Sequence, residues 1–527
     1  MLSIKQVLTI TGWGPIYDRD VRIEIKPLTI FIGENNSGKS FIALTYYALA
    51  NKVLDIVKFL SDKKTIKYIE SNDRVYSLIL EYIKRNSTLN TIIQRVIVEN
   101  KLGKVRDEIV NILTSNIEEL ITNFSTEILN SILRDHFPSG SIAEYVEYVF
   151  GSTISNLVNF KRKSFSIELN VSVNDRINIF IGISRKSGRV SVRENIRIEF
   201  TKIFIKDIKR KYRKLISKKV NNVIDTVIKT SILWEGLSRE IEKRRELIVM
   251  TIAYSLRDLL VYIADKVRSE LDGFYERINY LPASRSGILL SYRNLLATIL
   301  SLTTPLFDVK LSKLPGYIID FLRNISITEK TRGNELSKIF EEHIIDGRIF
   351  VEKIDSIPEI YYMDRFGNKI PINMISSLIS ELAPIDILTQ RGMIGDRSIT
   401  IIEEPESHLH PYIQVLLTCF LVRILNRYRS TILITTHSDI ILYKISNIIS
   451  QSVANVKESR YSICSGVKLD INEISVYIFR RKPSGDTKVE KISVSPYGIP
   501  DEEFRRIYEA LYDEYMNIYY KLQSILK

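Results

Sequence analysis

The sequence predicts an α/β protein that carries a large helical insertion and an antiparallel β subdomain. Near the amino end, an apolar strand at residues 28–32 ends at Gly33, and a helix without Gly or Pro is expected from residue 39 towards residue 60. Between residues 164 and 200 apolar side chains recur at every second position, as in a sheet covered on one face. A second α/β stretch follows from residue 374 to about residue 480.

The composition is typical of a folded, intracellular protein. The chain has 527 residues, of which 45% are hydrophobic and 26% charged, so a mostly disordered protein is excluded. Its two cysteines, Cys419 and Cys464, are 45 positions apart, which excludes a zinc ribbon or disulfide scaffold and favours a reducing compartment. The sequence has no pattern of a signal peptide or membrane span. We therefore expect a soluble, cytoplasmic protein without a membrane partner.

The strongest motif lies between the first apolar strand and the first helix. Residues 33–40 satisfy G-x-x-x-x-G-K-[ST], and in this setting backbone N–H groups and the helix N-terminus can wrap the phosphates of a nucleotide. Lys39 is expected to reach the β- and γ-phosphates, and the Ser40 hydroxyl to bind Mg²⁺. We thus expect a P-loop NTPase fold with ATP and Mg²⁺ as cofactors. The predicted nucleotide-binding residues are Gly33, Glu34, Asn35, Asn36, Ser37, Gly38, Lys39 and Ser40.

A P-loop needs a carboxylate at the end of another strand, and the stretch 398–404 supplies two. Glu403 is the predicted metal-binding residue, although glutamate stands where aspartate is usual. Glu404 is expected to orient and polarise the attacking water. A third strand ends at His437, which can donate a hydrogen bond to the γ-phosphate and so report whether ATP is bound. Glu404 and His437 are therefore the predicted catalytic residues.

His408 and His410, beside these glutamates, also suggest a zinc site, because imidazole and carboxylate are zinc ligands. Residues two apart on a helix do not share a face, and Pro411 indicates a turn that leads into a helix over residues 412–425. The spacing therefore argues against zinc.

The formal net charge of +13 comes from one part of the sequence. Residues 151–220 contain 18 Lys or Arg and 5 Asp or Glu, and the charges elsewhere cancel. Such a run attracts phosphate backbones through counterion release, but a solvated helix face explains it equally well. The scarcity of glutamine beside abundant isoleucine and lysine indicates a heat-adapted source, where ion-rich surfaces serve stability. The candidate nucleic-acid residues are Lys209, Arg210, Lys211, Arg213 and Lys214.

Together the motifs resemble the ABC-type ATPase heads of the OLD, RecF and SMC group, and within it the OLD-like, AAA-type ATP-binding proteins of DNA maintenance and antiviral defence. The resemblance rests on GENNSGKS, IIEEPESHLHP and TTHSD in that order, and covers residues 1–49 and about 347–497. YLPASRSGIL, at residues 280–289, is similar to a segment that precedes the second half of such heads. The resemblance implies an ATPase that forms a homodimer through its heads when ATP is bound. The dimer is then expected to grip nucleic acid, with DNA as the candidate, or to control a separate nuclease or effector protein.

The resemblance also implies a serine-rich signature motif that closes over the ATP of the other subunit. Residues 375–382 occupy its place, and Ser376 and Ser377 at a helix start can bind the γ-phosphate in trans, although Leu378 stands where glycine is expected. His410 falls where the family contacts its dimer partner, and the glutamine loop is not placed. No zinc hook is present and about thirty residues follow the head, too few for a TOPRIM nuclease. Nuclease chemistry is therefore expected of a partner.

The expected organisation alternates parts of the head with insertions. The segments are 1–50, the first part of the head with the P-loop; 51–160, a helical insertion; 161–205, the antiparallel β part; 206–345, the basic helix and further helical insertion; 346–480, the second part of the head; and 481–527, a terminal strand and packed helix. Two other functions stay open. One is a nucleotide-dependent regulator or scaffold with slow hydrolysis and no direct DNA role, and the other is a transporter-coupling ATPase.

Overall fold

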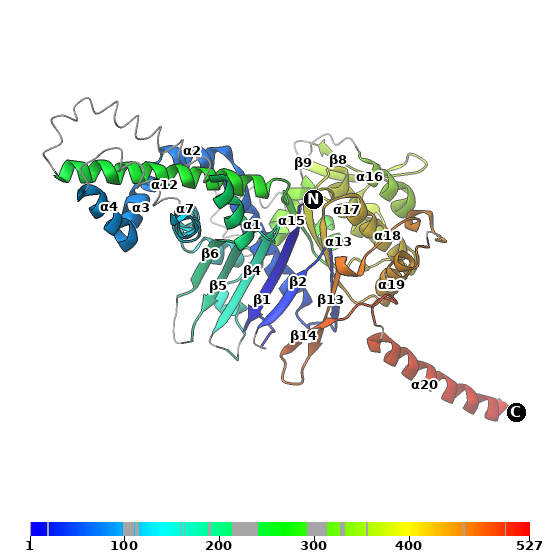
Figure 1. The fold of residues 1–527 in the computed structure, drawn as a ribbon. Coiled ribbons are helices and arrows are strands. Elements are labelled where there is room, and N and C mark those ends of the chain that lie inside the picture. Colours follow the sequence, from blue (N-terminus) through cyan, green and yellow to red (C-terminus); the bar gives the residue numbers. More distant parts are fainter. Residues whose placement is uncertain are drawn as a thin grey trace, which may run out of the picture.

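Three β-sheets organise the chain, two of them large and packed around one central helix (Figure 1). The computed structural model describes residues 2–17, 20–98, 110, 115–159, 161–162, 164–187, 191–212, 241–291, 314–326, 333–354, 357–456, 459–500 and 502–526. Arg213 and Lys214, two of the candidate nucleic-acid residues, lie outside these ranges.

The six-stranded sheet, here called the central sheet, is assembled from both ends of the sequence. From edge to edge its strands are β14 (Thr487–Ile492), β13 (Ile474–Arg481), β3 (Leu28–Gly33), β12 (Thr431–Thr436), β11 (Ser398–Glu403) and β7 (Arg277–Leu281). All neighbours are parallel except β13 and β14. Parallel strands are covered on both faces and need continuous apolar sequence, and β11 and β12 are buried over their full lengths. The expected α/β fold is confirmed.

Helices cover both faces of the central sheet because successive residues of each strand point to opposite sides. Phe31 packs in the cluster that contains α1 (Lys39–Ser61), whereas Ile30 and Ile32 pack in the cluster of the opposite face. The helices of that opposite face are α17 (Ser377–Gln390), α18 (Pro411–Arg427) and α19 (Asp439–Val453). Two hydrophobic cores thus fix the central sheet from both sides.

The five-stranded sheet is antiparallel throughout and covers α1 from the other side. Its order is β2 (Val21–Ile25), β1 (Ile4–Thr11), β4 (Phe165–Val173), β5 (Ile177–Arg185) and β6 (Arg193–Phe200). The predicted turn at Asn174 and Asp175 is present, with both residues in the left-handed region that Asn and Asp tolerate. The period-two pattern therefore predicted this sheet correctly, and β1 and β2 extend it.

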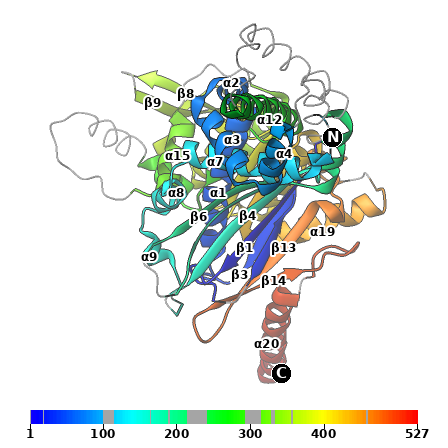
Figure 2. The ribbon, with the colours of Figure 1, turned by 60° about the vertical axis from the view of Figure 1, so that its left-hand side comes forward.

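Short helices form the insertion beside this sheet (Figure 2), and one long helix lies across them (Figure 1). Side chains of Asp62 and Asn72 cap successive helices by accepting hydrogen bonds from Lys64 N and Arg74 N, each 2.8 Å long, which ends one helix and starts the next. The short helices are α2 (Lys63–Ser71), α3 (Asp73–Arg85), α4 (Ser87–Val98), α6 (Ile117–Glu119), α7 (Thr126–His136), α8 (Ser141–Phe150) and α9 (Ile154–Leu157). The long helix α12 (Ile241–Leu271) packs against α2, α3 and α4.

A third, small sheet and several short helices lie beside α17. The sheet has the order β10 (Lys369–Pro371), β9 (Ile357–Asp364) and β8 (Gly347–Ile354), and its β9–β10 hairpin is the one predicted around Asp364 to Asn368. The neighbouring helices are α13 (Arg285–Leu290), α15 (Gly316–Ser326) and α16 (Glu335–Phe340). β7, which precedes α13, belongs to the central sheet, so the segment 206–345 is not wholly helical as expected.

Cys419 on α18 and Cys464 form a disulfide, with their Cα atoms 5.1 Å apart. The sequence interpretation was wrong here, because a spacing of 45 positions says nothing about distance once β12 and α19 fold between the two residues. Closing a loop of that length removes about 4 kcal/mol of chain entropy from the unfolded state. Intracellular proteins of heat-adapted organisms are the known exception to the rule that such bridges need an oxidising compartment.

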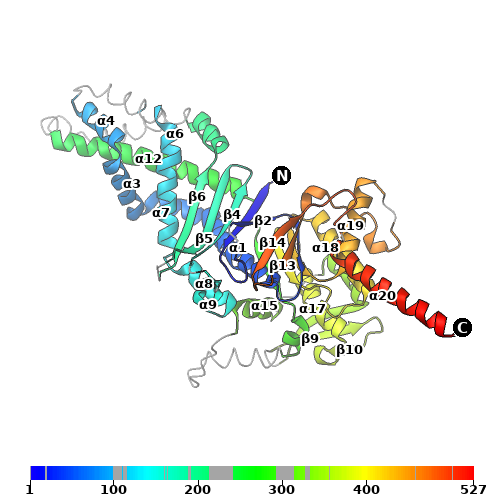
Figure 3. The same ribbon diagram turned by 90° about the horizontal axis from the view of Figure 1, so that it is seen from below.

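The terminal helix α20 (Glu502–Leu526) was expected to pack against the body, and this expectation was wrong. Figures 1 and 3 show the helix leading away from α18 and α19. Its large side chains, among them Leu511, Tyr512 and Tyr515, are exposed.

Of the helices in the described ranges, α1 is the one whose length and hydropathy would suit a membrane crossing. In that helix 72% of the relevant stretch is buried inside the fold, between the central and the antiparallel sheet. Its apolar composition is therefore explained by its place in the core.

Candidate functional site

The P-loop follows β3 directly and wraps around the start of α1. Gly33 and Gly38 have φ angles of 136° and 92°, and a Cβ on either would lie 2.2 Å from Phe479 O or from Pro15 Cγ. Only glycine fits both positions, which explains the two glycines of the motif. Gly38 is also the N-cap of α1, so the free N–H groups of that helix face the loop. Such a loop is suited to hold an anion.

Lys39 lies inside the P-loop, 5% exposed, with its ammonium group bound to the loop itself. Its Nζ donates hydrogen bonds to Gly33 O at 2.9 Å and to Glu34 O at 2.8 Å. Burial lowers the pKa of Lys39 to about 8, although the nearby carboxylates of Glu404 and Glu406 act in the opposite direction. The site therefore holds a cation that a negatively charged ligand would stabilise.

The order of the central sheet brings the distant motifs to one edge. β12 lies between β3 and β11, and its register pairs Thr436 with Ile32 and Thr435 with Glu403. Since the three strands are parallel, the P-loop, His437 and the two glutamates all follow carboxyl ends at the same level. This is the edge where open parallel sheets bind their ligands. The structure thus brings together the residues predicted for nucleotide, metal and catalysis.

Glu403 is a buried carboxylate, and one of its two oxygens makes no hydrogen bond. Its Oε2 accepts a hydrogen bond from Ala283 N at 3.1 Å, whereas Oε1 has no hydrogen-bond partner. A buried oxygen without a partner is costly, and a cation is the usual remedy. With the exposed Ser40 hydroxyl at the start of α1, Glu403 therefore fits a magnesium site.

Glu404 and His437 face each other beside the P-loop. Glu404 Oε1 lies 3.8 Å from His437 Nε2, and both side chains are about one-third exposed, at 36% and 31%. Glu404 has a φ of 41°, unusual for a glutamate, and its N–H donates to Thr435 O at 2.9 Å. Burial and the charge of Lys39 lower the pKa of His437, so the imidazole is neutral near pH 7.

Glu406 was not assigned a role from the sequence, yet it lies at the same edge. Its Oε1 accepts a hydrogen bond from His437 N at 2.6 Å, which holds the histidine backbone in place. Burial raises the pKa of this carboxyl group. Its position two residues after Glu404 was the available clue, but the sequence does not show that the chain turns back towards His437.

Arg285 is the second residue that the sequence did not single out, and it is fully buried. Its guanidinium donates to Glu403 O at 2.6 Å and to Glu404 O at 3.2 Å. It also forms an ion pair of 3.1 Å with Glu381, which is 1% exposed. The pair joins the end of β11 to α17. Arg285 follows β7, the strand beside β11, at the same edge of the central sheet.

The two signature serines begin α17 as predicted. Ser376 is the N-cap, its hydroxyl accepting from Ile379 N, and both Ser376 and Ser377 are exposed. The structure therefore presents them at a free helix N-terminus, but within one chain they do not belong to the P-loop site. Their proposed role in trans stays a prediction.

The other candidates are placed away from the P-loop or in structural roles. His410 is the N-cap of α18, with Nδ1 accepting from Tyr412 N at 3.2 Å. In the described part of the chain no group of three or more His, Cys, Asp or Glu side chains could hold a metal ion by themselves. Of the basic residues, Lys209 contacts Glu118 and Arg210 lies 3.8 Å from Asp207, while Lys211 is exposed.

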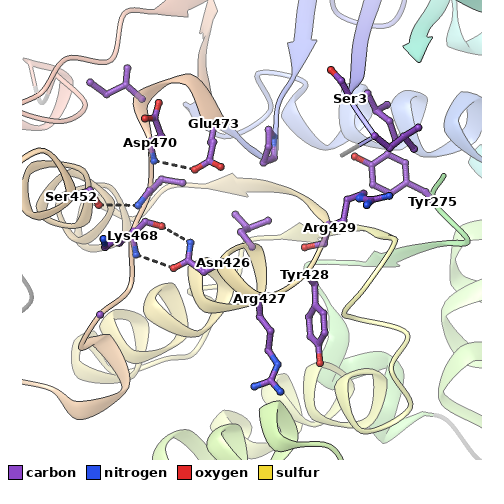
Figure 4. Close-up of a pocket in the computed structure, with 18 of the residues that line it drawn as sticks. Ser3, Tyr275, Asn426, Arg427, Tyr428, Arg429, Ser452, Lys468, Asp470 and Glu473 are labelled. Atoms are coloured by element: carbon purple, nitrogen blue, oxygen red, sulfur yellow. Dashed lines mark hydrogen bonds between the residues drawn. The ribbon is translucent and has the colours of Figure 1, made fainter. Parts of the chain in front are cut away.

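A cavity of about 890 Å³ opens at the opposite, amino edge of the central sheet (Figure 4). It is lined by residues just ahead of β3, β7, β12 and β13, namely Pro27, Tyr275, Ser430 and Glu473. Polar residues of its lining are hydrogen-bonded to one another. The Asn426 side chain donates to Lys468 O at 2.5 Å and accepts from Lys468 N at 2.9 Å. These bonds hold α18 to the segment before β13. The cavity is separate from the P-loop edge.

The fold and the P-loop edge define a P-loop ATPase head. A model of the AAA ATPase domain family matches residues 8–442, and the chain belongs to that family. The match confirms the predicted AAA-type ATPase family. No curated protein matches the chain.

Solved structures that resemble the chain include Smc head domains. One from Pyrococcus furiosus, bound to the C-terminal domain of ScpA, has 11% identity, a TM-score of 0.35, and coverage of 97% of this chain and 100% of that chain. Another, from Thermotoga maritima, has 9% identity and a TM-score of 0.35, covering 93% of this chain and 99% of that chain.

The lowered pKa of Lys39 predicts that ATP binding takes up protons above pH 8. At pH 8.5 most of this lysine is neutral in the free protein, whereas bound phosphates favour its ammonium form. Titration calorimetry at pH 8.5, in two buffers of different ionisation enthalpy, should show net uptake of a large fraction of one proton, and affinity should fall as the pH rises further.

The matched control is Lys39→Arg, because arginine stays charged over this range. It should bind ATP without that uptake. Equal uptake by the two proteins, or none by the wild type, would contradict the assignment of the proton to Lys39.

Proposed function

We propose that the protein hydrolyses ATP with Mg²⁺ in the cytoplasm, and that two copies associate head to head when ATP is bound. The observation that supports this most is that Lys39 meets Glu403, Glu404 and His437 at one edge of the central sheet. Lys39 follows β3, and the other three residues lie more than 350 positions later in the sequence.

Each group of the site has a separate role in phosphoryl transfer to water. The P-loop N–H groups and Lys39 bind the phosphates and spread their charge. Ser40 and Glu403 hold Mg²⁺, which when bound neutralises charge on the phosphate oxygens. Glu404 orients the attacking water and accepts its proton, because its carboxylate is partly exposed and close to His437. Neutral His437 donates a hydrogen bond to the γ-phosphate.

We propose that a second copy supplies the remaining contacts to the γ-phosphate. Ser376 and Ser377 are exposed at the N-terminus of α17, where N–H groups without helical partners favour an anion. We assign them to the γ-phosphate held by the other head. Arg285 is then a positioning residue and not a catalytic one, since it joins α17 to the strand that carries Glu403.

Glu404→Gln should bind ATP as tightly as the wild type but hydrolyse it at least a hundredfold more slowly. Since the amide cannot take a proton from water, the ATP-bound dimer should accumulate. Turnover is measured by phosphate release, and association by light scattering with and without Mg·ATP.

The matched control is Glu81→Gln, an exposed glutamate on α3 far along the insertion. It should keep wild-type turnover. If Glu404→Gln turned over within threefold of this control, Glu404 would not be the base.

We further propose that the cycle acts on DNA or on a separate effector protein, in DNA maintenance or antiviral defence. The support is the basic segment 151–220 and the membership of the ATPase family. The described part of that segment is only partly free to bind phosphates, since Lys209 already contacts Glu118.

A salt series tests the DNA role. Binding to single- and double-stranded DNA should weaken steeply with salt, and Arg210→Gln with Lys211→Gln should lower the slope by about 2 on logarithmic axes. The control pair is Lys64→Gln with Lys67→Gln, exposed lysines on α2. Salt-independent binding, or equal slopes for both pairs, would remove DNA from the proposal and favour an effector protein or a slow nucleotide-dependent regulator.

A further inference from the structure

The helix α20 presents an apolar stripe to solvent. At about 100° per residue, its large apolar side chains between positions 508 and 522 fall within a stripe roughly 120° wide, with two exceptions. The members of this stripe, here called the tyrosine stripe, are Tyr508, Leu511, Tyr512, Tyr515, Ile518, Tyr519 and Leu522, and they are between 41% and 62% exposed. The exceptions are Met516, which lies beside the stripe and is half-buried, and Tyr520, which points to the opposite side and is 60% exposed.

An isolated helix with such a face calls for a partner. Exposed apolar patches of this kind mark interaction sites, and tyrosine is enriched in protein interfaces. Tyr508 Oη donates to Asp439 at the start of α19, so α20 is anchored there at its amino end. Beyond this point the helix leads away from the body (Figure 3). The stripe is therefore available to another molecule.

The spacing of the stripe is that of a helix pair. Tyr508, Leu511, Tyr515, Ile518 and Leu522 alternate three and four positions apart, the pattern by which two helices interlock. A twofold axis between positions 516 and 517 would set Leu511 against the partner's Leu522, and Tyr515 against the partner's Ile518. An isologous pair needs only one kind of chain.

The charges beside the stripe select the direction of pairing. Glu514 and Lys521 lie seven positions apart on the same flank of the helix, the acidic one nearer the amino end. In an antiparallel pair this flank meets itself in reverse, so Glu514 faces the partner's Lys521, twice. In a parallel pair it meets the flank of Tyr512 and Tyr519 instead, which sets Tyr519, and no basic residue, beside Glu514.

We propose that α20 pairs in antiparallel orientation with α20 of a second copy of this chain, and so holds two heads together without nucleotide. A lipid surface suits the helix less well, because interfacial helices carry a basic polar face and this one carries Glu509, Asp513 and Glu514. The pairing is separate from the proposed ATP-dependent association of the heads, and a nucleotide-free experiment distinguishes the two.

The test is sedimentation equilibrium of the full chain, without nucleotide, from 0.1 to 50 μM. The wild type should associate into dimers. Tyr515→Glu should weaken the dimer at least a hundredfold, because it places a charge in the centre of the stripe. The matched control is Tyr520→Glu, the same change on the opposite side of the helix, which should leave the association unchanged within threefold.

A charge swap tests the direction. Glu514→Lys and Lys521→Glu should each weaken the dimer on the order of tenfold, since each turns two attractions into repulsions. Combining them restores opposite charges across the pair and should bring the affinity back within threefold of the wild type. No merely structural effect on one helix would be reversed in this way.

Four results would overturn the proposal: a monomeric wild type at 50 μM, equal weakening by Tyr515→Glu and Tyr520→Glu, single swaps without effect, or no recovery in the double variant. Flotation with phosphatidylglycerol vesicles supplies the remaining check. Binding by the wild type that Tyr515→Glu abolishes would assign the stripe to lipid and would also contradict the pairing.

Discussion

The parallel pairing of β3, β12 and β11 is the constraint on which the site depends. Parallel strands cannot be joined by a tight turn and need a crossover. Here the chain between β3 and β11 includes the helical insertion, strands β4 to β6 of the antiparallel sheet, and the small third sheet. The register sets Ile32 beside Thr436 and Glu403 beside Thr435. The P-loop, His437 and the glutamates therefore end at the same level. A slip of one residue would displace a strand end by about 3.3 Å and turn its side chains to the wrong face.

Arg285 adds a second constraint, between the site edge and α17. The guanidinium of Arg285 binds Glu381 and the carbonyl oxygens of Glu403 and Glu404. Because the side chain is fully buried, water cannot replace these partners. Removing one member of such a pair leaves a buried charge, at a cost of about 3–5 kcal/mol. We infer that the end of β11 and α17 shift as one unit. Since Ser376 caps the same helix, a displacement at the glutamates reaches the serines that we assign to a second head.

Much of this arrangement could be predicted from the sequence. The strand, glycine-rich loop and helix around Gly33 are encoded locally, and the apolar runs of β11 and β12 have the continuous burial of central parallel strands. Features that depend on distant contacts could not be predicted. Arg285 lies in an irregular segment whose partners are about a hundred positions away, and Cys419 meets Cys464 only after β12 and α19 have folded. The exposure of α20 was missed because a helix with an apolar stripe looks the same whether its partner is its own chain or another.

The central claim is that Lys39, Glu403, Glu404 and His437 surround one triphosphate. A crystal structure of the Glu404→Gln variant with Mg·ATP tests it most directly. The account predicts the γ-phosphate within about 3 Å of Lys39 Nζ and of the His437 ring, with the metal beside Ser40 and the Glu403 carboxylate. A nucleotide bound elsewhere, or phosphates in the P-loop with His437 and Glu403 turned away from them, would contradict it.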